Sequence, residues 1–168
     1  ICKKGEMQED LLRVVYHNCR LPHWNRSDLN AILAASRTAE RRVLEIAERF
    51  GDDVFHCAMN ELLDRNYRAM RQLILNTIPE QKQVFEDYIC DDGMGMGPYK
   101  LKCTMWREGD HVIFDFDGTD PQSIGFVNSS FANMWSAAAM AFAYLIDPTI
   151  PKNEGAFRPI DIVAQQGT

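Results

Sequence analysis

The chain has 168 residues, of which 46% are hydrophobic and 25% are charged, a balance typical of a soluble globular domain with its own core. The formal net charge of −6 argues against nucleic acid as the main partner, because phosphate recognition requires a clustered basic surface. The longest apolar stretch, residues 134–146, is shorter than the roughly 20 residues that cross a bilayer, so no membrane partner is expected.

The cysteines indicate free thiols rather than a structural framework. Their number is odd and they have no short spacings, which fits neither a set of disulfides nor a zinc site. No signal peptide is visible at the start of the chain. We therefore expect a cytoplasmic protein. The cysteines are Cys2, Cys19, Cys57, Cys90 and Cys103.

Apolar residues repeat at helical spacing through the first half of the chain and predict three helices. The first covers residues 6–20 and ends before a proline, which disfavours helix in the residue preceding it. Two longer helices follow, joined by a Gly-Asp-Asp link, and predict an αα-hairpin whose apolar stripes form core. The residues that mark their ends are Ser27 and Gly51 for one helix, and Asp52 or Asp53 and Pro79 for the other.

After Pro79 the apolar spacing changes to the period of two that is typical of strands. Residues 84–90 are a possible strand. The glycine-rich stretch 91–98 follows it and lacks the Gly-Lys-Ser/Thr ending of a phosphate-binding loop. We predict that this stretch is a connecting loop.

Residues 99–106 and 112–117 both alternate between apolar and polar side chains and predict an antiparallel hairpin. Two registers keep the apolar faces together, one with a four-residue turn and one with a two-residue turn at Gly109-Asp110. In both registers, lysines of the first strand face aspartates of the second. The pairs are Lys102 with Asp115 and Lys100 with Asp117 for the longer turn, and Lys102 with Asp117 for the shorter turn.

A further helix is predicted from Asn128, Ser129 or Ser130, which can cap it, to about Ile146, where Asp147-Pro148 stops it. It is apolar nearly all round and rich in alanine, so we expect it to be buried. Residues 151–159 are expected to be irregular and residues 160–164 to form a short strand. The predicted fold class is therefore α+β: a long αα-hairpin, then an antiparallel β-hairpin and a buried small-residue helix. We group the chain into a helical part, 1–80, and a second part, 81–168.

Residues 112–119, Val-Ile-Phe-Asp-Phe-Asp-Gly-Thr, match the first motif of haloacid-dehalogenase-like phosphatases. In that chemistry Asp115 would be the nucleophile and Asp117 the acid/base, with Mg²⁺ neutralising the phosphoryl group. That family's strand lies in a parallel sheet covered on both faces, whereas this one belongs to an amphipathic hairpin whose polar face holds both aspartates. We interpret the aspartates first as cross-strand partners of the lysines, and keep a phosphatase as an alternative.

A series of motifs in order resembles the hydantoinase B family. The motifs are Phe-Asp-Phe-Asp-Gly-Thr-Asp-Pro-Gln at 114–122, Gly-Phe-Val-Asn at 125–128, and Ile-Pro-Lys-Asn-Glu-Gly-Ala-Phe-Arg-Pro-Ile at 150–160. The chain ends in Gly-Thr, as members of the family tend to, and its first half is also similar to theirs. The family includes the B subunits of ATP-dependent hydantoinases, half of 5-oxoprolinase, and the large α subunit of acetone carboxylase.

Within this family, residues 16–25 and 91–97 resemble most the acetone carboxylase α subunit. The resemblance implies an ATP-dependent ligase that joins acetone and bicarbonate as acetoacetate, with Mn²⁺ in this subunit and ATP bound by a partner subunit. It also implies a hetero-oligomer with a small-molecule substrate, of which this chain would be an internal segment, inactive by itself. The alternatives are a B-type subunit of a hydantoinase or 5-oxoprolinase, and a non-catalytic structural segment.

Two groups of residues are candidates for binding an anion such as bicarbonate or a phosphorylated intermediate. One is the start of the buried helix, where free N–H groups and the helix dipole favour negative charge. Its residues are Asn128, Ser129 and Ser130. The other is Arg158, whose planar fork suits carboxylate or phosphate. The structural alternatives are ordinary helix capping, and an ion pair of Arg158 with Glu154 or Asp161.

Asp115 and Asp117 are also candidates for binding a divalent ion, because both side chains point to the same face of their strand. The histidines have no spacing typical of metal ligands. We therefore expect the Mn²⁺ site of the whole enzyme to lie outside this chain.

Overall fold

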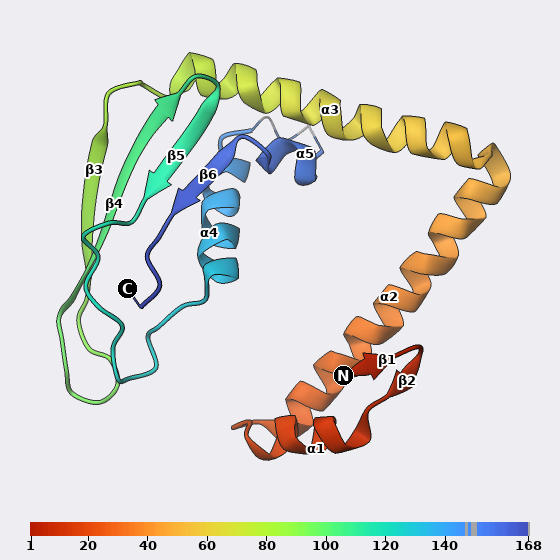
Figure 1. Ribbon diagram of the computed structural model, residues 1–168, viewed down its shortest axis with the longest axis horizontal. Coiled ribbons are helices and arrows are strands. Elements are labelled where there is room, and N and C mark those ends of the chain that lie inside the picture. The colour runs from red at the N-terminus through yellow and green to blue at the C-terminus, as the bar shows by residue number, and fades with distance from the viewer. Residues whose placement is uncertain (147, 149–150, 168) are drawn as a thin grey trace. The chain divides into compact units, whose positions relative to one another are not determined.

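Figure 1 shows the computed structural model, which describes residues 1–146, 148 and 151–167. Asp147, at the predicted helix stop, and Ile150 and Thr168, in the family motifs, lie outside the described residues. The chain divides into two compact units, an N-terminal unit, Ile1–Cys57, and a C-terminal unit, Ala58–Thr168.

The N-terminal unit begins with a small hairpin that the sequence did not predict. Its elements are β1 (Cys2–Lys3), β2 (Glu6–Met7), α1 (Glu9–His17) and α2 (Pro22–Phe50). The predicted helix over 6–20 is therefore wrong at both ends. Lys4 and Gly5 have φ values of 52° and 84°, the left-handed pair that a two-residue hairpin turn requires, so the chain reverses before the helix begins.

Helix α2 begins at Pro22 and not after Ser27, because proline is preorganised for the first position of a helix. Its predicted end at Gly51 is confirmed, with a φ of 86°. No residue of α2 is buried in the described part of the chain, so the expectation that its apolar stripe forms core is wrong. Val43 and Phe50, which belong to this stripe, are 45% and 54% exposed.

The C-terminal unit contains a four-stranded sheet with the order β3-β4-β5-β6. Its elements are most of α3 (Asp52–Thr77), then β3 (Gln83–Ile89), β4 (Tyr99–Glu108), β5 (His111–Asp115), α4 (Phe131–Ala143), α5 (Glu154–Phe157) and β6 (Ile160–Val163). Figure 1 shows α4 beside β6, and α3 at the end of the sheet that holds the β4–β5 turn. The core lies between α3, α4 and the strands β5 and β6. Its fully buried side chains include Met70, Ile74, Val112 and Phe142.

The β4–β5 hairpin has the shorter of the two predicted turns, with Glu108 paired with His111. The expected charge pairs are nevertheless wrong: among the described residues, no ion pair joins Lys100 or Lys102 to the two aspartates. The strand ends at Asp115, and the chain then turns out of the sheet. As a result the side chain of Thr119, and not Asp117, binds the backbone of Lys102.

The strand predicted over 160–164 is confirmed as β6, and it pairs in parallel with β5, so the sheet is mixed. This places β5 in the interior of the sheet, where Val112 and Ile113 are buried. The α+β fold class is confirmed, with helices packed against a mostly antiparallel sheet. The segment expected to be irregular contains the one-turn helix α5.

Helix α4 begins where the sequence predicts it. Ser130 is its N-cap, and the Oγ of this serine accepts a hydrogen bond from the backbone N–H of Asn133 at 3.2 Å. The helix is not buried all round, because only Ala138, Ala139 and Phe142 are buried while Met140 is 57% exposed. One face of α4 therefore packs on the core, and its first turn borders a cavity.

Candidate functional site

A cavity of about 830 Å³ lies between the sheet and α4 within the C-terminal unit. Its apolar lining includes Leu101, Phe114, Phe116, Val127, Phe131 and Met134. Its polar lining includes Lys100, Asp120, Ser123, Asn128, Ser129, Ser130 and Gln165. This combination of a mainly apolar wall and a few convergent polar groups is typical of a small-molecule site.

The loop after β5 reaches the cavity because two side chains fix it to the edge of β4. Thr119 Oγ1 accepts a hydrogen bond from the N–H of Lys102 at 3.1 Å and donates to its carbonyl at 3.0 Å. Asp120 Oδ2 accepts from the N–H of Lys100 at 2.7 Å, and the N–H of Asp120 donates to the carbonyl of Lys100 at 2.9 Å. The side chains of Thr119 and Asp120 thus bind the backbone of β4 where a neighbouring strand would otherwise pair with it. These contacts direct residues 121–130 along the cavity.

The three residues predicted at the start of α4 all line the cavity, but they have different structural roles. Asn128 closes a turn: its Oδ1 accepts from the N–H of Ser123 at 2.9 Å, and its Nδ2 donates to the carbonyl of the same serine at 2.8 Å. Ser129 Oγ accepts from the Asn133 side chain at 2.8 Å, and Ser130 is the N-cap. Ser130 accepts the N–H of Asn133, which leaves the N–H groups of Phe131 and Ala132 without an acceptor in the helix. Anion binding at this end of the cavity stays a prediction.

Asp92 is a buried residue beside the cavity that the sequence did not single out. Its carboxylate has no exposed surface. Oδ1 accepts from the N–H groups of Met94 at 2.8 Å and Met96 at 3.1 Å. Oδ2 accepts from the hydroxyl of Tyr99 at 3.1 Å and from the N–H of Gly125 at 3.2 Å. In the sequence, Asp92 is visible only as an aspartate at the start of a glycine-rich loop. Its hydrogen-bond partner Gly125 lies 33 residues away, so no local pattern could have indicated the contact.

The Asp92 carboxyl is held in its ionised form. Burial by itself raises its pKa, but the hydrogen bonds from Met94, Met96, Tyr99 and Gly125 outweigh this effect, and the pKa lies below the usual range. The N–H groups of the glycine-rich loop are thereby turned toward aspartates, since Gly93 also donates to Asp91 at 2.7 Å. The N–H groups of Gly93, Met94 and Met96 are therefore occupied within the loop, and its role as a connecting loop stays a prediction.

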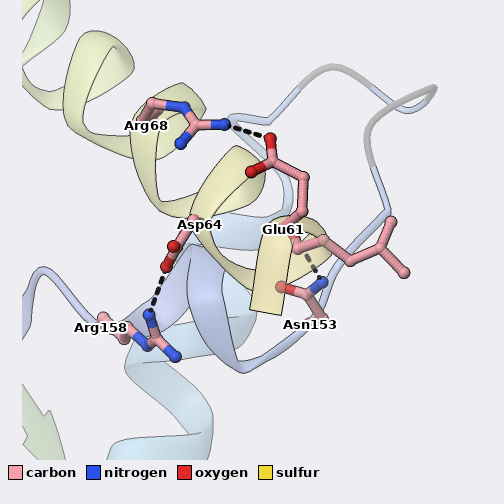
Figure 2. Close-up of polar contacts among 6 residues, drawn as sticks. Glu61, Asp64, Arg68, Asn153 and Arg158 are labelled. Atoms are coloured by element: carbon pink, nitrogen blue, oxygen red, sulfur yellow. Dashed lines mark hydrogen bonds and ion pairs between the residues drawn. The ribbon is translucent and has the colours of Figure 1, made fainter. Parts of the chain in front are cut away.

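Arg158 is not part of the cavity lining. It docks its segment onto α3, as Figure 2 shows. Its Nη1 lies 3.1 Å from Asp64 Oδ1. Asn153 Nδ2 of the same segment donates to the carbonyl of Leu62 at 3.4 Å. The predicted ion pair of Arg158 with Glu154 or Asp161 is wrong, because Arg158 pairs with Asp64. Asp161 instead contacts His111 at 2.7 Å. Anion binding by Arg158 stays a prediction.

The side chains of Asp115 and Asp117 both accept hydrogen bonds in the turn after β5. Asp115 Oδ1 accepts from the N–H of Asp117 at 3.0 Å, and Asp117 Oδ1 accepts from Gln165 Nε2 at 3.2 Å. Across the described residues, no group of three or more His, Cys, Asp or Glu side chains is arranged to hold a metal ion. The donor set of the described residues therefore does not fit the Mn²⁺ that the family resemblance implies. Binding of a divalent ion by the aspartate pair alone stays a prediction.

Cys103 lies on the cavity wall, and we predict that its thiol reacts slowly with alkylating reagents. Burial and, secondarily, the negative charge of Asp115 raise its pKa, which lowers the fraction of reactive thiolate at a given pH. Asp115→Asn should shift the pH–rate curve of Cys103 to lower pH and leave that of the exposed Cys90 in place. Pulsed iodoacetamide labelling with peptide mass spectrometry measures both cysteines in one sample. An unchanged curve for Cys103 would contradict the charge effect.

The chain is similar to a known protein family and to several of its members. The family model described as Hydantoinase B/oxoprolinase matches residues 1–168. The caprolactamase subunit beta of Pseudomonas jessenii is 28% identical over 95% of this chain and 27% of its own length. The 5-oxoprolinase of Dictyostelium discoideum is 29% identical over 100% of this chain and 13% of its own length.

The solved structure of the ATP-dependent caprolactamase from Pseudomonas jessenii is also similar, with a TM-score of 0.77 and 27% identity. The match covers 96% of this chain and 28% of that chain. The present chain thus spans between about an eighth and just over a quarter of the length of these relatives. Of the helices in the described residues, none has both the length and the apolarity of a membrane span.

Proposed function

Because the chain belongs to the hydantoinase B/oxoprolinase family, we propose that it is part of an enzyme that opens a cyclic amide at the expense of ATP. The observation that carries this proposal is the match to relatives named caprolactamase and 5-oxoprolinase over 95% and 100% of the chain. Caprolactam, 5-oxoproline and hydantoin all contain a ring amide. The names therefore favour the hydantoinase and oxoprolinase alternative over acetone carboxylation, which the sequence alone placed first.

The proposed reaction breaks the C–N bond of the ring amide. One water molecule supplies OH to the carbonyl carbon and H to the nitrogen, which gives an open-chain product with a carboxyl group. A second water molecule is consumed when ATP becomes ADP and phosphate. The energy of ATP is required because an amide is a poor electrophile and a small ring amide can close again.

We assign the cavity between the sheet and α4 to the substrate or its activated form. Its volume of about 830 Å³ lies in the usual range for small-molecule sites. The apolar wall, with Phe114 and Met134, suits the CH₂ groups of a ring. The polar end, at Asn128 and the first turn of α4, suits the amide oxygen or a phosphoryl group attached to it.

A partner subunit and a cytoplasmic location complete the proposal. The relative from Pseudomonas jessenii is named as a subunit beta, which supports a hetero-oligomer. The five cysteines are all free, which suits a reducing compartment.

The substrate class is tested by ATP hydrolysis with the intact enzyme, including any partner subunit. We expect that 5-oxoproline, hydantoin or caprolactam stimulates phosphate release and is opened in a one-to-one ratio with ADP. Acetone with bicarbonate should cause no stimulation. Acetone-dependent ADP formation with production of acetoacetate would overturn the proposal.

The cavity assignment is tested by Asn128→Ala. Loss of the two hydrogen bonds to Ser123 frees the turn before α4, and we expect kcat/KM to fall about tenfold or more. Asn76→Ala is the matched control, because Asn76 is exposed on α3 and, among the described residues, its side chain bonds only Gln72. In the wild-type protein, saturating cyclic amide should also slow alkylation of Cys103 and not of Cys90. Unchanged kinetics in Asn128→Ala together with unprotected Cys103 would exclude the cavity as the site.

A further inference from the structure

Two loops that are distant in the sequence meet at Asp92. The glycine-rich loop, residues 91–98, wraps its N–H groups of Met94 and Met96 around one carboxylate oxygen. The loop 123–127, which runs along the cavity, donates the N–H of Gly125 to the other oxygen at 3.2 Å. The backbone is joined as well, since the N–H of Phe126 donates to the carbonyl of Asp92 at 3.1 Å.

The two loops approach so closely that two glycines at the contact have no room for a Cβ. A Cβ added at Gly125 would lie 2.0 Å from the carbonyl oxygen of Asp92. A Cβ added at Gly93 would lie 1.7 Å from the ring of Phe126. Glycine at position 125, where the neighbouring atom is backbone, is therefore what permits the carboxylate to reach both loops, whereas the exposed Phe126 ring at Gly93 is free to rotate away.

The carboxylate also holds one wall of the cavity directly. The hydroxyl of Tyr99 donates to Asp92 Oδ2 at 3.1 Å, and Tyr99 lines the cavity at the start of β4. Through Gly125, Asp92 fixes a loop whose Ser123 and Val127 line the same cavity. The chain continues to Asn128, whose Nδ2 donates to the carbonyl of Gly125 at 3.4 Å.

We propose that Asp92 is a positioning residue that sets the shape of the cavity by fixing Tyr99 and the 123–127 loop from behind. It does not touch the cavity itself, because it is fully buried and absent from the lining. As a role in substrate binding, this inference rests on the proposed function. The part of the inference that concerns the shape of the cavity does not depend on whether the enzyme opens a cyclic amide.

The role requires a carboxylate and not merely a side chain of that size. All four groups that face it can donate hydrogen bonds, and an ionised carboxylate accepts at both oxygens. In Asp92→Asn, one of the two positions becomes an NH₂ group. That NH₂ group then faces either the N–H groups of Met94 and Met96 or the N–H of Gly125. In each case two hydrogen-bond donors face each other, and the hydrogen bond is lost. The isosteric change thus releases one of the two loops.

The experiment compares Asp92→Asn with Asp91→Asn in the intact enzyme. Asp91 is adjacent and exposed, and its carboxylate accepts a hydrogen bond from the N–H of Gly93 within its own loop. We expect Asp92→Asn to raise KM for the cyclic amide about tenfold or more while kcat stays within about threefold. Asp91→Asn should leave both constants within about twofold. Equal KM values for wild type, Asp92→Asn and Asp91→Asn would overturn the inference.

A second readout separates this inference from the proposed function. Alkylation of Cys103, relative to Cys90, reports access to the cavity without turnover, and it should be several-fold faster in Asp92→Asn than in Asp91→Asn. If the wild-type enzyme opens no cyclic amide, the proposed function fails, and the Cys103 rates still decide the role of Asp92. Should Asp92→Asn not fold, Tyr99→Phe removes one bond and keeps the carboxylate. A rise in Cys103 labelling in that variant supports the inference, and an unchanged rate overturns it.

Discussion

Replacing Gly155 by alanine is expected to destabilise the C-terminal unit by about 3 kcal/mol. This glycine lies in α5, in the segment that docks onto α3. An added Cβ would lie 2.0 Å from the carbonyl oxygen of Leu63 and 2.7 Å from its carbonyl carbon. Both sides of this contact are backbone, so no flexible side chain can move away, and the segment must separate from α3.

Chemical denaturation followed by circular dichroism measures the effect of Gly155→Ala. Gly109→Ala is the matched control, because open space surrounds Gly109 and the only cost is its φ of 62°. We expect about 1 kcal/mol for that control, the usual cost of a left-handed conformation for a residue with a Cβ. Equal losses in the two variants would mean that close packing against Leu63 is not what Gly155 provides.

The other large effect is expected for Phe142→Ala, which should cost about 4 kcal/mol of folding stability. Phe142 is 2% exposed and is the largest fully buried side chain of the core. Its ring meets that of Phe114 edge to face, with centroids 5.7 Å apart. Because Phe114 lines the cavity, the lost contact also removes the support of one cavity wall. Loss of stability and weaker substrate binding should therefore appear together.

Met140→Ala provides the comparison on the same helix. Met140 is 57% exposed, so its truncation removes little buried surface and should cost less than about 1 kcal/mol. Thermal and denaturant unfolding of the two variants, with KM measured below the transition, distinguishes a core role from a general effect on α4. A Phe142→Ala variant as stable as Met140→Ala would show that α4 is not anchored through this ring.

Local chemistry let the sequence predict several elements and part of the candidate site. The left-handed Gly51 ends α2, and the hydroxyl of Ser130 caps α4. For the β4–β5 hairpin the sequence left two turns open, of which the structure has the Gly109-Asp110 turn. In each case the deciding contact joins residues only a few positions apart. The same local patterns identified the family, and they placed residues 128–130 at the helix start that borders the cavity.

Periodicity misled the prediction in two places, at the start of the first helix and in the apolar stripe of α2. The spacing over 6–20 fits a helix, yet the first residues form a hairpin because Lys4 and Gly5 turn left-handed. The stripe on α2 has helical spacing but buries nothing in the described residues. Spacing determines which side chains share a face, and it does not determine what covers that face.

Only the tertiary structure decided the contacts between residues far apart in the chain. Arg158 binds Asp64, 94 residues away, and not the nearer acids that the sequence offered. Asp92 joins Gly125 across 33 residues, and β6 adds to β5 in parallel. The sequence by itself therefore determined the end of α2 at Gly51, the start of α4 and the family, because these depend on neighbouring residues. The buried carboxylate and the walls of the cavity depend on packing of distant segments, which no local pattern encodes.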